Sequence, residues 1–115
     1  MTYMLLIVEP VGQRGQRGEE EGRRKYAAMA KFGEGLKARG LLQLTESLRS
    51  DGVRVQSRGG KRSFVDGPFS EAKEMVGGFF LLNTDDREQA LAIAGECPAV
   101  EWATIEVREL GPCYT

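Results

Sequence analysis

Two carboxylates, Asp66 and Glu46, are the side chains in this sequence best suited to acid–base chemistry. Asp66 precedes Gly67 and Pro68, so it lies at a sharp turn, and Glu46 interrupts an apolar stretch. If both side chains face one cavity, their environments can separate their pKa values into those of an acid and a base. Each also has a structural explanation: Asp66 can accept backbone N–H bonds in the turn, and Glu46 can pair with an Arg or Lys.

A second group of side chains could bind a substrate. Lys73 could hold an anionic group and Glu74 could exchange a second proton, although surface salt bridges explain both equally well. These residues predict a small anionic or aromatic ligand. The candidate apolar or aromatic walls, which could equally be core or interface residues, are Met4, Phe69, Phe80, Trp102 and Tyr114.

The 115-residue chain contains no histidine, and this absence restricts its chemistry. It excludes Ser-His-Asp and Cys-His nucleophiles, histidine bases and histidine-ligated zinc or haem. Cys97 and Cys113 fit neither a CxxC nor a zinc-knuckle spacing, so we expect two reduced thiols. No glycine-rich phosphate loop is present. We therefore expect neither a metal nor a cofactor.

The composition predicts one small domain over residues 1–115, because 41% of the residues are hydrophobic and 29% are charged. No apolar run is long enough to cross a bilayer and no secretory signal is visible, so we expect a cytoplasmic protein with no membrane partner. Basic residues gather in the first half and acidic residues in the second. We interpret this asymmetry as two complementary faces that help subunits associate, and expect no nucleic-acid partner.

The first half of the chain predicts a strand, a helix and a second strand. Met4–Val8 is continuously apolar, which is typical of a strand covered on both faces. Glu19–Arg39 has apolar residues at spacings of three and four and acidic residues four positions before basic ones, which predicts a helix. Leu41–Leu48 then predicts the second strand.

The middle of the chain predicts a β-hairpin. Val53–Ser57 and Arg62–Asp66 flank a turn centred on Gly59-Gly60, a pair suited to positive φ angles. Counting outward from the turn places Val55 opposite Phe64, so one face of the hairpin is apolar, as packing requires. Pro68–Glu74 then predicts a short helical segment with Pro at its first position.

The last part repeats the strand–helix–strand pattern. Val76–Asn83 predicts a core strand, Asp85 begins a helix with Glu88 as its capping-box partner, and Ala103–Leu110 predicts the last strand. The order predicts an α+β fold, the ferredoxin-like split βαβ with an inserted hairpin. Both helices would cover one face of the sheet. Because the strands are too apolar to leave the other face in water, we expect a second copy to cover it in a homodimer.

The stretch from Val65 to Glu74, which contains Asp66-Gly67-Pro68-Phe69 and precedes Gly77-Gly78-Phe79-Phe80, resembles the DGPF family of YCII-related proteins. Tyr3–Ile7 and Ile105–Arg108 resemble that family's two ends, so the resemblance spans nearly the whole chain. It implies a dimeric α/β barrel. Related YCII proteins have been suggested to be enzymes that use a His/Asp pair, and this chain, with Asp66 but no histidine, cannot form one.

Three functions are compatible with these observations. The first is a binding or accessory role, with a small-molecule pocket near the DGPF turn. The second is a cofactor-free enzyme of isomerase, lyase or oxygenase type, with Asp66 as acid or base and Glu46 assisting. The third, implied by the resemblance, is a protein-interaction module linked to extracytoplasmic-function sigma factors. The fold alone does not decide among them.

Overall fold

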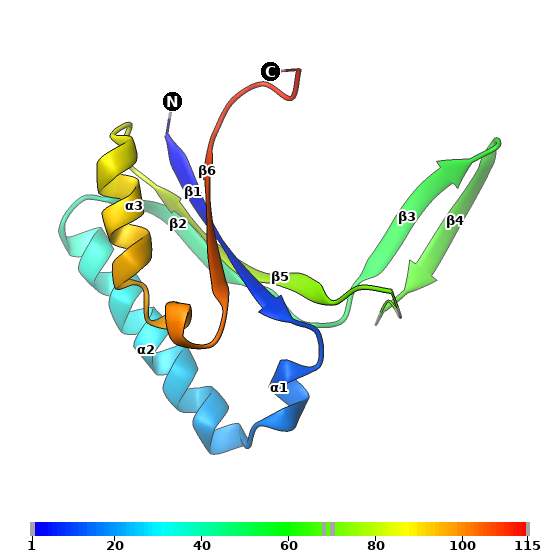
Figure 1. Ribbon diagram of the computed structural model, residues 1–115, viewed down its shortest axis with the longest axis horizontal. Helices are drawn as coiled ribbons and strands as arrows, with labels where there is room; N and C mark the ends of the chain where they lie inside the picture. Colours follow the sequence, from blue (N-terminus) through cyan, green and yellow to red (C-terminus); the bar gives the residue numbers. More distant parts are fainter. Residues whose placement is uncertain (1, 68, 70, 115) are drawn as a thin grey trace.

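The computed structural model describes residues 2–67, 69 and 71–114, which form a four-stranded sheet, helices on one of its faces and a separate hairpin (Figure 1). The sheet contains β1 (Tyr3–Pro10), β2 (Leu42–Ser47), β5 (Glu74–Leu82) and β6 (Thr104–Glu109). Its order is β2-β5-β1-β6 and every pair is antiparallel. This order confirms the predicted α+β, ferredoxin-like arrangement.

Two long helices, α2 (Glu19–Ala38) and α3 (Arg87–Glu96), cross between strands on the same face of the sheet (Figure 1). The cap of α3 lies one residue later than predicted. Asp86 Oδ1 accepts hydrogen bonds from the backbone N–H groups of Glu88 (3.0 Å) and Gln89 (3.4 Å). Asp85 therefore precedes the cap, and the capping box expected between Asp85 and Glu88 is wrong.

Two short helices were not expected from the sequence. Helix α1 (Gln13–Gln16) lies within the glycine-rich stretch Val11–Gly18, whose composition predicts a loop, and the 3₁₀ helix η1 (Pro98–Glu101) follows α3. Gly12 precedes α1 with a φ of 88°, which a glycine adopts without strain. Helix α1 places its side chains between the end of β1 and the start of α2.

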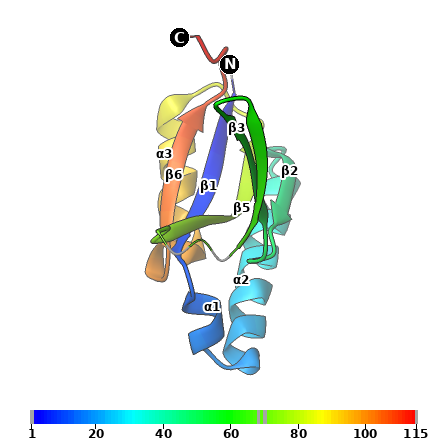
Figure 2. The same cartoon turned by 90° about the vertical axis from the view of Figure 1, so that its right-hand side faces the viewer.

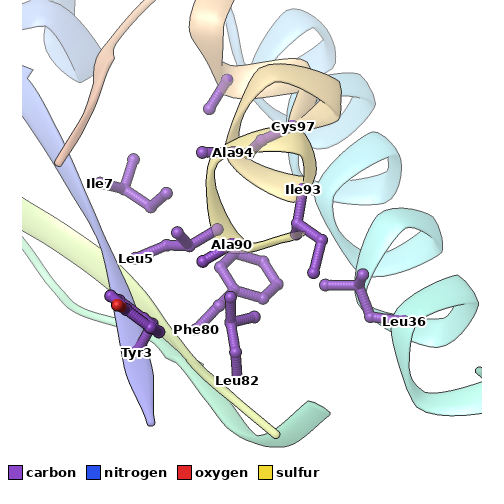
Figure 3. Close-up of a cluster of buried hydrophobic side chains, with 11 residues drawn as sticks. Tyr3, Leu5, Ile7, Leu36, Phe80, Leu82, Ala90, Ile93, Ala94 and Cys97 are labelled. Atoms are coloured by element: carbon purple, nitrogen blue, oxygen red, sulfur yellow. The ribbon is translucent and has the colours of Figure 1, made fainter. Parts of the chain in front are cut away.

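The core lies between the helices and one face of the sheet (Figure 3). On β1, Leu5 and Ile7 are buried against this layer, and Leu36 of α2 and Ile93 of α3 pack from the other side. The rings of Phe32 and Phe80 meet edge to face, with centroids 5.4 Å apart. Burial along β1 alternates, because successive side chains of a strand point to opposite faces.

The opposite face of the sheet is not covered by any described part of this chain. We call it the open face; it carries Met4, Leu6 and Val8 of β1, all half-buried, with Phe79 and Leu81 of β5 beside them. Strand β1 is therefore apolar on both faces although the chain covers only one.

The hairpin, β3 (Val53–Arg58) and β4 (Lys61–Asp66), forms a separate two-stranded sheet that we call the arm, residues 53–66. Gly59 and Gly60 have φ angles of 58° and 79°, and Val55 pairs with Phe64, as predicted. The arm extends from the body on the side away from the helices (Figures 1 and 2).

The helical segment predicted for residues 68–74 is wrong in its described part. Pro68 and Ser70 lie outside the described residues. Phe69 and residues 71–73 are not helical, although the Ala72 N–H donates to the carbonyl of Phe69 in a turn (2.9 Å), and β5 already begins at Glu74.

Candidate functional site

A pocket of about 500 Å³ lies between α2 and the helix-covered face of the sheet. Met29 and Ala30 of α2 line it on one side, and Ile7 of β1 and Phe80 of β5 line it on the other. Trp102, which follows η1, forms a further aromatic wall. The volume falls within the usual range for small-molecule sites, and most of these walls are apolar.

A buried ion pair lies at one end of the pocket. Glu9, at the end of β1, is 5% exposed, and Arg14 of α1 donates to both of its carboxylate oxygens, from Nε (2.5 Å) and Nη2 (3.3 Å). Arg14 also donates to the carbonyls of Leu48 (2.6 Å) and Gly77 (3.1 Å). These bonds tie α1 to β1, β5 and the residue that follows β2, and they involve all three nitrogens of the Arg14 guanidinium.

Gly77 provides the space for this ion pair. It lies at an irregularity of β5, where the pairing with β1 shifts between Ile7 and Val8. A Cβ atom at position 77 would lie 2.7 Å from Arg14 Nη2 and closer still to the carboxylate of Glu9. A residue larger than glycine would therefore displace the pair.

Arg17 differs from Arg14, because its Nη1 is buried and has no hydrogen-bond partner among the described residues. The side chain reaches from the end of α1 to the pocket and lies against Gly22 of α2, with Nε 3.6 Å from the position that a Cβ there would occupy. Three carboxylates follow Arg17 closely in sequence, but each pairs with another cation, as Glu19–Arg23, Glu20–Arg24 and Glu21–Lys25.

Lys25 adds a second cation at the same end of the pocket. Its Nζ lies 4.4 Å from the ring centroid of Trp102 and 3.2 Å from Glu21 Oε1. This arrangement combines a cation–π contact with an ion pair in which the Lys25 side chain is half-buried. The pocket thus has an apolar floor, an aromatic wall and a cationic end, where Arg17 Nη1 has no hydrogen-bond partner among the described residues.

The family model of the YCII-related domain matches residues 1–113 of this chain. The chain belongs to the YCII-related family. No curated protein matches it. The family assignment agrees with the resemblance carried by residues 65–80 and by the two ends of the sequence.

In this YCII-related domain the two predicted catalytic carboxylates lie in different sheets. Glu46 is on β2 of the main sheet and contributes to the pocket's boundary. Its neighbour Thr45 faces Gly33 of α2, so strand alternation directs the Glu46 side chain toward the open face. Asp66 ends β4 opposite Val53, is exposed and does not line the pocket.

Of the four predicted substrate-binding residues, only Phe80 lines the pocket. Met4 lies on the open face, opposite Leu81. Phe69 stacks under Arg54 of the arm, with Arg54 Cζ 3.9 Å from its ring centroid. The carbonyl of Lys73 accepts a hydrogen bond from the Val11 N–H (2.9 Å).

The two remaining candidate wall residues, Trp102 and Tyr114, lie in different places. Trp102 lines the pocket, whereas Tyr114 is exposed near the C-terminus. The pocket described here lies between α2 and the sheet, away from Asp66 and Phe69. A pocket at the DGPF turn stays a prediction. The catalytic roles of Asp66 and Glu46 stay predictions, but the two residues do not share the pocket described above.

The residues that sequence reasoning missed are Glu9, Arg14, Arg17 and Lys25. A signal was present, because Gly-Gln-Arg occurs twice in succession over residues 12–17, followed by a third glycine. The repeat places Arg14 and Arg17 three positions apart, which is about one helical turn. Its glycines favoured a loop, which concealed both arginines.

No group of three or more metal-ligating side chains comes together among the described residues. Across the same part of the chain, no helix has the length and hydropathy needed to span a membrane.

Proposed function

We propose that this YCII-related domain binds a small, mainly apolar molecule with an anionic group, in the pocket between α2 and the sheet. The observation that carries the proposal is the buried Nη1 of Arg17, which has no acceptor among the described residues. We assign the domain to the DGPF group of the family on Asp66-Gly67-Pro68-Phe69.

A buried donor without an acceptor destabilises a fold by about 1–3 kcal/mol, and more when the group is charged. A ligand carboxylate at the cationic end of the pocket would accept from Arg17 and remove that cost. Guanidinium groups suit this role, because their parallel N–H bonds match the two oxygens of a carboxylate. Lys25 would add to the positive potential there.

The rest of the pocket favours an apolar ligand body. Met29, Phe80 and Trp102 present aliphatic, aromatic and sulfur-containing surface, and Tyr26 lies at the pocket's edge. An aryl or branched aliphatic carboxylate combines both properties. It also agrees with the anionic or aromatic metabolite expected from the sequence.

The pocket favours binding or an accessory role over turnover. Glu9, the buried carboxylate in its lining, already accepts hydrogen bonds from Arg14 on both of its oxygens. Asp66, the family-motif carboxylate, is on the arm.

The test is isothermal titration of the protein with a panel of aryl and aliphatic carboxylates, each beside its neutral primary amide. We expect binding of at least one carboxylate, about 10- to 100-fold weaker binding by Arg17→Met, and little change for the matched amide. Arg23→Met is the control, because the Arg23 side chain is 78% exposed and outside the pocket between α2 and the sheet.

The outcomes are distinct. If no carboxylate binds, or if Arg17→Met binds as tightly as the wild type, the proposal is wrong. Asp66→Asn provides the second comparison: we expect unchanged affinity, and a loss of binding there would instead move the site to the DGPF turn.

A further inference from the structure

The arm is a large part of the fold that the pocket does not explain. Val53, Val55 and Phe64 share one of its faces and are all exposed, Phe64 to 68%. A two-stranded hairpin standing alone in water is only marginally stable. Its apolar face therefore requires a surface to pack against, and no described part of the same chain supplies one.

The dimensions of the chain indicate how much of its surface is available for contact with a partner. Its radius of gyration is 16.0 Å, whereas a compact domain of this length has about 13 Å. Its accessible surface is 8186 Å², whereas a folded monomer of this mass exposes about 6,200 Å². The excess is roughly 2,000 Å² per chain, and a dimer that buried it would fall within the range of obligate interfaces.

The arm and the open face lie on the same side of the molecule. Figure 1 shows the arm on the side of the sheet opposite the helices, and Figure 2 shows it in front of the sheet. The open face exposes apolar side chains of its own, Leu44 on β2 and Val76 on β5 among them. One partner approaching from this side would contact both surfaces.

We propose that the apolar face of the arm packs against the body of a second copy of this chain, in a two-fold dimer with the arms exchanged. A two-fold axis gives each arm the same partner surface, so both apolar faces are buried by a single interface type. This goes beyond contact between the two open faces, because it assigns the arm to the partner.

The charges favour the partner's body over its arm. The arm carries Arg54, Arg58, Lys61 and Arg62 against the single acid Asp66. The whole chain has a net charge of −1, so the rest of the chain is net acidic. Arg54, Arg58 and Lys61 lie on the face of the arm opposite Phe64, so their charges act at long range. Two basic arms repel each other, whereas a basic arm and an acidic body attract and steer association.

The experiment measures the dimer dissociation constant of the full chain by sedimentation and light scattering. We expect a wild-type dimer at micromolar concentration and a dissociation constant raised at least 100-fold by Phe64→Asp. Gln56→Asp is the matched control, because Gln56 lies on the other face of the same arm, and we expect less than a threefold change. Far-UV circular dichroism checks that both variants keep the body fold.

A second variant removes the arm. The Gly67 N–H donates to the carbonyl of Gly52 (2.7 Å), so the ends of the arm are adjacent and two glycines can replace residues 53–66. We expect a folded, monomeric chain with intact carboxylate binding.

Three results would overturn the inference. If the wild-type chain is monomeric at 100 µM, the arm-exchanged dimer is wrong. If Phe64→Asp dimerises as tightly as Gln56→Asp but Leu6→Asp on the open face does not, the arms are not exchanged. The dimer would then form through the open faces of the two sheets. If the chain is monomeric and its arm binds duplex DNA, the basic side chains of the arm bind nucleic acid instead of a second copy. None of these results affects the carboxylate-binding test, because that test depends on Arg17 and not on the arm.

Discussion

Arg14 holds the carboxylate of Glu9 with two of its nitrogens in a space that exists because residue 77 is a glycine. The remaining bonds of the guanidinium go to the carbonyls of Leu48 and Gly77. This pair joins the end of β1, helix α1 and two other strands, and it fixes the chain immediately before Arg17. Its integrity therefore determines where the cationic end of the pocket lies.

Gly77→Ala should destabilise the fold by about 1–3 kcal/mol, because the added methyl group overlaps the ion pair and forces it to move. Urea denaturation measures the free energy of unfolding. Gly35→Ala is the matched control: nothing lies within 4 Å of its Cβ position on α2, so alanine should stabilise the protein by up to about 1 kcal/mol. Equal effects of the two substitutions would contradict the role given to Gly77.

Arg14→Met should cost about 2–3 kcal/mol, since it leaves the buried carboxylate of Glu9 without its partner. This is below the usual cost of breaking a fully buried pair, because the Arg14 side chain keeps 30% of its surface exposed. Adding Glu9→Gln to Arg14→Met should recover part of the loss. A double-mutant cycle with no coupling between the two positions would sink this account.

Asp86→Ala should lower the free energy of unfolding by about 1 kcal/mol, because the backbone N–H groups of Glu88 and Gln89 lose their acceptor at the start of α3. Asp85→Ala, one residue earlier and outside the cap, should change it by less than about 0.5 kcal/mol. Thermal unfolding of the two variants compares them directly, and a larger loss for Asp85→Ala would restore the cap position expected from the sequence.

The two cysteines should differ in reactivity. Cys97 is fully buried beside Met29, and burial raises the pKa of its thiol above the ordinary 9.0; Cys113 is exposed. Titration with a thiol reagent should modify Cys113 in the native protein and Cys97 only after denaturation. Rapid modification of Cys97 without denaturant would contradict its burial.

The same pKa shift predicts a loss of stability at alkaline pH. Below pH 9.0 the thiol is protonated in both the folded and the unfolded chain, so the shift changes nothing. Above it the unfolded chain loses the proton first, and stability falls as the pH rises. Tyr3 acts in the same direction above 10.0, because burial and then its bond to Glu109 raise its pKa. Cys97→Ala should remove the part of the decline that begins near pH 9.

Local patterns were sufficient to predict the main elements of this fold. The apolar run Met4–Val8 marked β1, the spacing over Glu19–Arg39 marked α2, and Gly59-Gly60 fixed the register that pairs Val55 with Phe64. These features depend on residues close together in the sequence. Strand order followed from them through the short list of topologies that such a sequence of elements permits.

The pocket could not be predicted in the same way, because its polar end is built from contacts between distant segments. Arg14 meets Gly77 across 63 positions, and a glycine-rich stretch gave no indication of helix α1. The arm is a further case. Its alternation correctly predicted one apolar face, but alternation does not specify whether that face packs on its own chain or on another.

Helix α2 packs against the core more closely in its second half than in its first. Its buried residues, Gly33 and Leu36, both lie in the second half, whereas the first half lines the pocket with Gly22, Lys25 and Tyr26 and has no buried residue. Amide protons in the first turns should therefore exchange with solvent through local opening, at a lower free energy than those near Leu36. A ligand bound in the pocket would pack against the first half of α2 and stabilise it. Ligand binding should therefore slow the exchange of the amide protons in this part of the helix.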